Sequence, residues 1–433
     1  MRTLGIRRED KNRWERRTPI IPRHLKAIIE RRPDVRGIVQ PSPRRVFQDD
    51  AYRDAGATVS EDLSSCDVIF AVKEIPVETI QPNTVYACFS HTIKGQAQNM
   101  PMLKRMAELG CTLIDYEKIT DASGRRLLFF GRQAGQAGMI DSLHLLGERF
   151  AAEGMETPFS EVSMAHCYAN LDAAMEAVTR LAIALRTDPL PDSLQPLVVA
   201  FTGEGNVSRG AQEVFDLLPH TVVAARTLLR EGPPKGGQLC KVVFSEQDMM
   251  QRTDDGPFEL DEYYAHPARY RSVFERYLRH IAVLVNGIYW DERYPRLVTN
   301  VGLSRLLASG RSKLRLIADI TCDVRGSIEC TIKTTDPDSP SYVYDPDTAE
   351  LRMGVSGRGP AILAVDNLPA ELPMDASLHF SESLLPFIGE IVAADLQLPF
   401  ERSDLPIAVR RATLLYNGQL TPAFRYLERY IGD

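Results

Sequence analysis

A glycine-rich turn near the middle of the chain constrains its fold more than any other feature. The turn reads Gly203, Glu204, Gly205, Asn206, Val207, Ser208, Arg209 and Gly210, with the apolar run 197–201 before it and a helical pattern after it. A strand that enters a helix through closely spaced glycines is typical of dinucleotide sites, where backbone N–H groups approach the pyrophosphate. We expect the first two glycines to permit the sharp turn, and Gly210 to let the helix pack on the strand. Because the third glycine comes later than in the usual G-x-G-x-x-G pattern, a turn without a ligand is the alternative.

Short apolar runs alternate with helical patterns on both sides of this turn. The earlier runs are 68–72, 85–89, 112–114 and 127–130, and the later ones are 197–201, 221–225, 281–285, 314–317 and 362–365. Such alternation predicts parallel sheets covered by helices on both faces. We therefore predict an α/β protein with two doubly wound Rossmann-like domains facing each other across a cleft. The substrate-side domain comprises 1–134 plus 371–433, and the dinucleotide-binding domain comprises 135–370. Within this plan, 334–353 forms a hairpin or surface loop, and the helical pattern of 382–430 returns to the first domain.

Composition and charge exclude several classes of function. The 433 residues are 25% charged and 44% hydrophobic with a net charge of −7, which is ordinary for a globular protein of two or three domains. Without a clustered basic face we expect no nucleic-acid partner, and without a long apolar stretch we expect no membrane. The seven cysteines contain no C-x-x-C pair and the eight histidines no H-E-x-x-H spacing. We therefore expect reduced thiols, no metal site and a cytoplasmic location.

Polar residues follow the apolar runs of the first series, at the strand ends where parallel sheets bind ligands. Lys73 and Glu74 follow the run 68–72, and His91 follows the run 85–89. A lysine whose pKa is lowered by burial and a histidine are the side chains best suited to proton transfer near neutral pH. We therefore predict that Lys73 and His91 are catalytic. Taken singly, each has a structural alternative, namely a surface lysine paired with Glu74 and a hydrogen-bonded histidine at a sheet edge.

Two pairs of arginines are candidates for binding carboxylates. Arg16 and Arg17 lie near the N-terminus, and Arg125 and Arg126 precede the run 127–130. Arginine binds carboxylates through two parallel hydrogen bonds. If one arginine of each pair enters the site, the substrate carries two or more carboxylates; arginines on solvated faces are the alternative.

These segments together resemble a known family. They are GIRREDKNRWERRTPIIP (5–22), SHTIKGQAQNMPML (90–103), LIDYEK (113–118), GRQAGQAGMIDSLHLLG (131–147), FTGEGNVSRGAQEVF (201–215), NGIYW (286–290) and VDNLPAELP (365–373). The chain resembles the lysine–2-oxoglutarate reductase domain, the saccharopine-forming half of the bifunctional aminoadipic semialdehyde synthase, from about residue 3 to 430. More distantly it is similar to fungal saccharopine dehydrogenase (lysine-forming) and to the alanine dehydrogenase and transhydrogenase folds.

The resemblance implies reductive condensation of L-lysine with 2-oxoglutarate to saccharopine, with a nicotinamide dinucleotide as hydride donor. It assigns acid–base catalysis to Lys73 and His91. Substrate binding falls to Arg17, Glu74, Glu117, Arg126 and Phe130. Cofactor binding falls to the segment from Gly203 to Gly210, and Asp366 and Leu368 line the nicotinamide side. Because the similarity ends where the bifunctional protein continues, we expect a separate saccharopine-oxidising enzyme as a partner.

The residues after the glycine turn predict whether the cofactor carries a 2′-phosphate. NAD sites usually place an acidic residue about 20 residues after the glycine turn, where it binds the ribose 2′-hydroxyl. The stretch 221–230 contains no Asp or Glu but holds Arg226 and Arg230. We therefore predict NADP(H) over NAD(H), with Arg226 near the 2′-phosphate. The alternatives in function are an opine-type or alanine dehydrogenase-like enzyme that uses another amine, and a non-catalytic nicotinamide-binding regulator.

Overall fold

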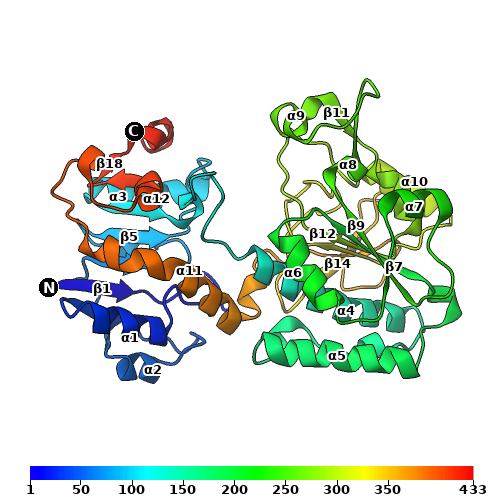
Figure 1. Cartoon of the computed structure of the whole chain (residues 1–433), viewed down its shortest axis with the longest axis horizontal. Coiled ribbons are helices and arrows are strands. Elements are labelled where there is room, and N and C mark those ends of the chain that lie inside the picture. The colour runs from blue at the N-terminus through cyan, green and yellow to red at the C-terminus, as the bar shows by residue number, and fades with distance from the viewer. Residues whose placement is uncertain (433) are drawn as a thin grey trace. The chain divides into compact units, whose positions relative to one another are not determined.

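The computed structural model describes residues 1–432 and divides into two compact units (Figure 1). Unit 1 combines Met1–Phe130 with the C-terminal segment that starts at Pro373, and unit 2 is Gly131–Leu372. The chain thus leaves unit 1 at residue 130 and returns at 373, close to the expected crossings after 134 and before 371. The first crossing lies earlier because helix α4 (Gly131–Ala152) starts at Gly131 and makes its main contacts with elements of unit 2.

Unit 1 is built on an eight-stranded sheet in the order β18-β17-β6-β5-β4-β1-β2-β3. Its strands are β1 (Arg2–Ile6), β2 (Val35–Val39), β3 (Thr58–Val59), β4 (Val68–Phe70), β5 (Val85–Cys88), β6 (Thr112–Asp115), β17 (Thr413–Tyr416) and β18 (Gln419–Leu420). The six strands from the N-terminal segment are parallel, and β17 pairs antiparallel with β6. The C-terminal segment therefore returns to unit 1 as expected, and it adds two edge strands that its helical pattern did not indicate.

Helices cover both faces of this sheet. They are α1 (Pro22–Arg31), α2 (Asp49–Asp54), α3 (Met100–Glu108), α11 (Pro373–Ala393), α12 (Ile407–Arg411) and α13 (Glu428–Ile431). Helices α1 and α11 contact each other and share one apolar core with β1, whereas α3 contacts α13 and belongs to a second core. Two separate apolar cores on opposite faces are what a doubly wound parallel sheet requires.

Unit 2 repeats this plan with a second eight-stranded sheet, in the order β15-β14-β16-β13-β12-β7-β9-β8. Its strands are β7 (Leu197–Thr202), β8 (Thr221–Val222), β9 (Leu239–Phe244), β12 (Val283–Asn286), β13 (Leu316–Asp319), β14 (Ser341–Tyr344), β15 (Leu351–Met353) and β16 (Ala361–Leu363). Strands β14 and β15 form the antiparallel hairpin expected within 334–353. A separate pair, β10 (Met250–Arg252) and β11 (Tyr270–Ser272), forms a small two-stranded sheet.

The helices of unit 2 divide between the two faces of its sheet. Besides α4, they are α5 (Leu171–Thr187), α6 (Asn206–Phe215), α7 (Ala225–Glu231), α8 (Glu246–Met249), α9 (Leu260–Ala265) and α10 (Asn300–Ala308). Helices α4, α5 and α6 share one core, and α7, α8 and α10 contribute to the other. Figure 1 shows α4 and α5 below β7 and α7, α8 and α10 above it. The prediction of two doubly wound α/β units is confirmed.

One apolar run of the sequence analysis is not a strand, and another forms a shorter strand than expected. The run 127–130 is not a strand, since only an isolated bridge between Thr120 and Arg126 lies near it. The run 221–225 shortens to the two residues of β8, because α7 already begins at Ala225. Conversely, the sequence analysis missed β9, whose apolar run is interrupted by Lys241. That lysine is buried, and its Nζ lies 2.5 Å from Asp216 Oδ1.

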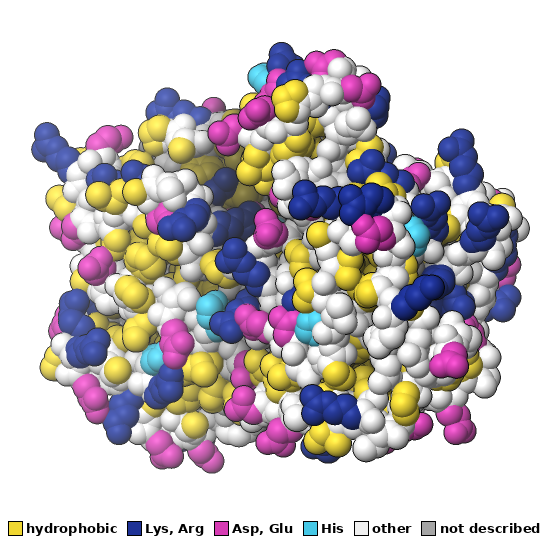
Figure 2. Space-filling view, turned by 45° about the vertical axis from the view of Figure 1, so that its right-hand side comes forward, with side chains coloured by type: hydrophobic (Ala, Val, Ile, Leu, Met, Phe, Trp, Pro, Cys, Tyr) yellow, Lys and Arg dark blue, Asp and Glu magenta, His cyan; other side chains and the backbone are white. Residues whose placement is uncertain are grey.

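The surface carries charges of both signs. On the face drawn in Figure 2, lysine and arginine side chains are interspersed with aspartate and glutamate, so neither sign dominates that face. Among residues 1–432, no helix is long and apolar enough to cross a membrane.

Candidate functional site

The predicted acid–base residues meet at neighbouring strand ends in unit 1. Lys73 and Glu74 lie just beyond β4, and His91 lies just beyond β5, the next strand in the sheet. Nδ1 of His91 lies 2.7 Å from Glu74 Oε1, and Nζ of Lys11 donates to the same carboxylate at 3.0 Å. The structural alternative for Lys73 was a surface ion pair with Glu74. In the structure Glu74 makes hydrogen bonds with His91 and Lys11, and its effect on Lys73 is a weaker electrostatic attraction.

The electrostatics of this cluster favour proton exchange. Although partial burial opposes it, the hydrogen bond with His91 lowers the pKa of Glu74 to about 2. Glu74 is therefore a carboxylate, and we infer that His91 donates its Nδ1 proton to it, which leaves Nε2 for a substrate. Burial, followed by the nearby Arg17 guanidinium, lowers the pKa of Lys73 below its usual value. A lysine of lowered pKa exchanges protons more readily near neutral pH.

The backbone around these residues is held in place. His91 adopts a left-handed conformation with φ of 47°, which is uncommon for a residue other than glycine and is concentrated at functional sites. The amide of Asn99 donates to the His91 carbonyl at 3.0 Å and so fixes this turn. The carboxylate of Glu9 accepts hydrogen bonds from the backbone N–H groups of Val72 (2.6 Å) and Lys73 (3.0 Å). Glu9 is therefore a positioning residue for Lys73 that the sequence analysis missed.

Arg17 and Phe130, both predicted to bind substrate, contact each other. The Arg17 guanidinium lies over the Phe130 ring at 4.3 Å from its centroid. Arg17 also makes two hydrogen bonds with Glu15, from Nε to Oε1 at 2.8 Å and from Nη2 to Oε2 at 2.6 Å. Both side chains are buried. A substrate carboxylate that binds Arg17 would thus either share the guanidinium with Glu15 or take the place of the Glu15 carboxylate.

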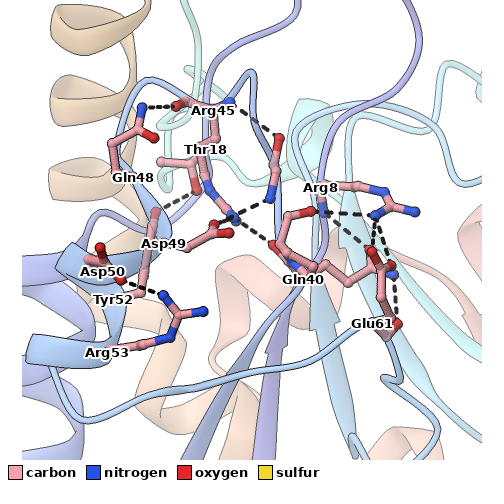
Figure 3. Close-up of polar contacts among 12 residues, drawn as sticks. Arg8, Thr18, Gln40, Arg45, Gln48, Asp49, Asp50, Tyr52, Arg53 and Glu61 are labelled. Carbon is pink, nitrogen blue, oxygen red and sulfur yellow. Dashed lines mark hydrogen bonds and ion pairs between the residues drawn. The ribbon is translucent and has the colours of Figure 1, made fainter.

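The loop that carries Arg17 is anchored to the neighbouring α2 region (Figure 3). The Tyr52 hydroxyl contacts Thr18 Oγ1 at 3.0 Å and the Ile20 carbonyl at 2.8 Å. The buried Arg45 guanidinium lies over the Tyr52 ring and donates to Asp49 at 2.7 Å. These contacts hold Thr18 and Ile20 in place, and so fix the segment directly after Arg17.

The second predicted carboxylate-binding pair lies beyond β6. Arg126 is exposed and forms an ion pair with Glu117. The backbone N–H of Glu117 donates to Asp115 at 2.8 Å, and Asp115 also accepts a hydrogen bond from Ser90, the residue before His91. Burial raises the pKa of Asp115 to about 6. Unit 1 therefore holds two contact pairs, His91 with Glu74 and Arg126 with Glu117, and Asp115 links Glu117 to the residue before His91. The roles of these residues, and of Lys73, stay predictions.

The glycine turn lies in unit 2 and has the conformation that a phosphate site needs. Gly203 has φ of 77°, and Gly205 is the residue before α6. A Cβ added at Gly205 would have no atom within 4 Å, so a ligand can approach the backbone there. The first two glycines thus have the geometry expected for a dinucleotide pyrophosphate, and Asn206 and Val207 form the first residues of α6.

The expected role of the third glycine was wrong. A Cβ added at Gly210 would lie 2.0 Å from the Arg132 carbonyl oxygen, and one at Gly135 would lie 1.9 Å from the Val207 carbonyl oxygen. Gly210 therefore faces α4 and permits the close approach of the two helices, while other residues of α6 pack on β7. Ser208 is buried at this crossing, where it accepts a hydrogen bond from Gln212 at 3.0 Å.

Buried hydrogen bonds fix the strand ends beneath the turn. Asn286 accepts a hydrogen bond from Thr202 Oγ1 at 2.8 Å and donates one to Asp319 Oδ1 at 2.8 Å. Thr202 Oγ1 also accepts from the N–H of Gly287 at 3.2 Å. The network ties together the carboxyl ends of β7, β12 and β13, where a dinucleotide binds in this class of sheet.

A cavity of about 400 Å³ opens beside the turn. It is lined by Gly203, Glu204, Gly205, Glu246, Met249, Met250, Leu260, Tyr263, Tyr264, Gly287, Ile288, Tyr289 and Tyr294. Its mixture of exposed backbone at the glycines and apolar or aromatic walls fits an adenosine diphosphate portion. The residues present therefore fit the cofactor that the turn indicates.

The remaining predicted cofactor residues lie elsewhere. Arg226 is exposed on α7, outside the cavity lining, and follows β8, the edge strand. The NADP(H) prediction looked for the ribose-binding residue about 20 residues after the glycine turn, in 221–230. In the structure the strand paired with β7 is β9, and the 221–230 segment lies beyond it at β8 and α7. The preference for NADP(H) stays a prediction. Asp366 is exposed after β16, and the Leu368 side chain is buried in the core against α4, near Gly138.

A buried acidic cluster in unit 2 was also missed. Burial raises the pKa of Glu371 to about 7 and that of Asp141 well above its usual value. Nδ1 of His166 lies 3.1 Å from Glu371 Oε2. Only the spacing of these residues along the chain was visible in the sequence, so nothing there indicated that they meet.

Comparisons with known proteins confirm the resemblance. Residues 5–137 match the family described as the N-terminal domain of alanine dehydrogenase/PNT. Over 98% of its length the chain is 39% identical to the alpha-aminoadipic semialdehyde synthase of Arabidopsis thaliana and 38% identical to the mitochondrial one of Bos taurus. The chain covers 41% and 47% of those two proteins, less than half of each. It is also 25% identical to the saccharopine dehydrogenase [NAD(+), L-lysine-forming] of Emericella nidulans, over 87% of this chain and 89% of that one.

Solved structures agree on the fold. An L-alanine dehydrogenase superposes with a TM-score of 0.63 at 16% identity, covering 99% of this chain and 100% of that one. A transhydrogenase from Sinorhizobium meliloti superposes with a TM-score of 0.58 at 15% identity, covering 97% of this chain and 100% of that one. At such identities the similarity establishes the two-unit α/β fold and carries no conclusion about substrate.

Proposed function

We propose that this chain catalyses the reversible reductive condensation of L-lysine with 2-oxoglutarate to saccharopine, with a nicotinamide dinucleotide as hydride donor. The names of the relatives support the reaction class, although the chain spans less than half of the two synthases. The observation that carries the proposal is the hydrogen bond between His91 Nδ1 and Glu74 Oε1, 2.7 Å long, beside Lys73. This contact supports an acid–base role for His91, since it lies at the strand ends where ligands bind in parallel sheets.

The reaction needs proton transfer at two points. The lysine ε-nitrogen forms a bond to the keto carbon and loses a proton, and the resulting carbinolamine then loses its hydroxyl as water. Lys73, with its lowered pKa, accepts the proton from the nitrogen and returns it to the keto oxygen, which becomes the hydroxyl. His91, held by Glu74, then donates a second proton to the departing hydroxyl. A nicotinamide dinucleotide held at the glycine turn 203–210 would supply the hydride for the reduction, so that one water would leave and one reduced cofactor would be consumed per saccharopine.

Charge complementarity supports a substrate with several carboxylates. Arg17 and Arg126 each already hold a carboxylate in this structure, from Glu15 and Glu117 respectively. A substrate carboxylate can take the place of either glutamate at a planar guanidinium. A site for ammonia alone would not require two such positions.

The test is nicotinamide oxidation with 2-oxoglutarate and a panel of amines that includes lysine, ornithine and ammonia. Turnover that requires both lysine and 2-oxoglutarate, with saccharopine identified by mass spectrometry, supports the proposal. Turnover only with ornithine would assign a related opine-type reaction, and turnover with ammonia would assign an alanine dehydrogenase-like one. Binding of the dinucleotide with no turnover for any pair would contradict an enzymatic role and favour a regulator.

A further inference from the structure

The strand order of unit 2 indicates where the adenosine ribose of a dinucleotide would lie. In a dinucleotide-binding sheet, the ribose lies beyond the strand next to the one that carries the glycine turn. Here that neighbour is β9, paired in parallel with β7 along six residues from Leu197↔Leu239 to Thr202↔Phe244. The N–H of Gly203 donates to the Phe244 carbonyl at 2.9 Å, so the end of β9 is attached directly to the glycine turn. The residues that follow are Ser245 and Glu246.

We propose that Glu246 binds the adenosine ribose hydroxyls and thereby makes this chain prefer NAD(H) to NADP(H). This inference rests on the proposed function only for the identity of the cofactor as a nicotinamide dinucleotide. It replaces Arg226 as the residue that decides the preference.

The position of Glu246 is fixed before any ligand binds. Ser245 and Asp248 form a capping box at the start of α8, in which Ser245 Oγ lies 2.7 Å from Asp248 Oδ2. The Tyr264 hydroxyl donates to Glu246 Oε1 at 2.9 Å. The other oxygen, Oε2, accepts no hydrogen bond from any residue in 1–432 and is left for a ribose hydroxyl. A carboxylate is the group that accepts hydrogen bonds from the 2′-hydroxyl in NAD sites.

The charge of the cavity opposes a 2′-phosphate. Two of its lining residues, Glu204 and Glu246, are acidic, and none of the lining residues in the described chain is lysine or arginine. A phosphate at the ribose would bring a second anion beside the Glu246 carboxylate with no cation to offset the repulsion. Discrimination against NADPH then comes from this repulsion as well as from the lost hydrogen bond.

The remaining walls of the cavity suit adenine. Leu260 and Tyr264 on α9, and Tyr289 beyond β12, line it and are largely exposed. Exposed aromatic and aliphatic side chains beside a polar turn offer a flat apolar surface to a base. The adenosine is therefore placed entirely by residues of unit 2.

The experiment is the binding of NADH and NADPH to the whole chain, followed by nicotinamide fluorescence without lysine or 2-oxoglutarate. We expect NADH to bind roughly tenfold more tightly than NADPH or better, as one charge-assisted hydrogen bond gives. Glu246→Gln should bring the two affinities to within about threefold, since it removes the charge and keeps the shape. Glu292→Gln, an exposed carboxylate outside the cavity, is the matched control and should keep the wild-type ratio.

Two further measurements keep the proposal falsifiable. Arg226→Ala should leave the ratio unchanged, whereas selective loss of NADPH affinity would restore Arg226 as the deciding residue. On the wild-type chain, ADP-ribose should displace NADH, and 2′-phospho-ADP-ribose should fail to do so. This measurement uses no variant, so it does not depend on the folding of one. Equal or tighter binding of NADPH would overturn the inference. Tight NADH binding with no turnover of lysine and 2-oxoglutarate would instead overturn the proposed function and leave this inference standing.

Discussion

At the scale of single residues, the contact between His91 and Glu74 allows the catalytic and structural roles of these two side chains to be tested with variants. Glu74 contacts His91 at 2.7 Å, and its pKa is lowered to about 2, so it is a carboxylate near neutral pH. We predict that His91→Ala lowers kcat for saccharopine formation by roughly two orders of magnitude, the usual contribution of a general acid. Glu74→Gln should lower kcat across the pH series, because it removes the charged partner that holds the His91 ring.

The measurement is kcat over a pH series for wild type and both variants. Asp62→Asn, an exposed carboxylate elsewhere in unit 1, is the control and should leave the profile in place. An unchanged profile in Glu74→Gln, with normal thermal stability, would show that Glu74 only supports the loop.

At the scale of elements, the crossing of α4 and α6 fixes where the cofactor turn points. The backbones of the two helices approach so closely that a Cβ at Gly135 would lie 1.9 Å from the Val207 carbonyl oxygen. We predict that Gly135→Ala destabilises the fold by roughly 3 kcal/mol or more, because backbone must move to admit it. The displaced α6 should also weaken dinucleotide binding.

Thermal unfolding and NADH affinity test this prediction together. Gly389→Ala, on α11 with open space around the added methyl group, is the matched control. It should be neutral or stabilise the chain by up to about 1 kcal/mol, as alanine does in helices. Equal melting temperatures for the two variants would mean that the crossing relaxes without cost.

The helices and strands also show how much of the fold could be predicted from the sequence. The period of apolar residues predicted two parallel sheets and placed Lys73 and His91 at neighbouring strand ends, because strand ends in such sheets share one edge. It could not reveal β9, since Lys241 interrupts the apolar run and only its contact with Asp216 explains its burial. Without that strand, the expected ribose position falls near Arg226 and not at Glu246, the position that we propose. Strand order depends on contacts between residues far apart in the chain, which periodicity does not report.

At the scale of the whole molecule, buried acids make stability depend on pH. Burial raises the pKa of Glu371 from 4.5 to about 7, and it also raises the pKa of the neighbouring Asp141 well above its usual value. A raised pKa means that the folded state binds more protons than the unfolded one between these values. Stability should therefore be fully present below about pH 4.5 for this group and fall as pH rises toward 7.

Glu371→Gln should remove this loss, because an amide keeps the hydrogen-bonding shape and never ionises. We expect the variant to gain on the order of 2 kcal/mol relative to wild type between pH 5 and 7.5, measured as melting temperature in a buffer series. Glu390→Gln, an exposed position on α11, is the control and should track the wild type throughout. Since His166 contacts Glu371 and burial lowers its pKa, His166 contributes with the opposite sign at lower pH. The quantity compared is therefore the difference in melting temperature between the Glu371 variant and wild type at each pH. A difference that stays constant with pH would contradict a protonated Glu371.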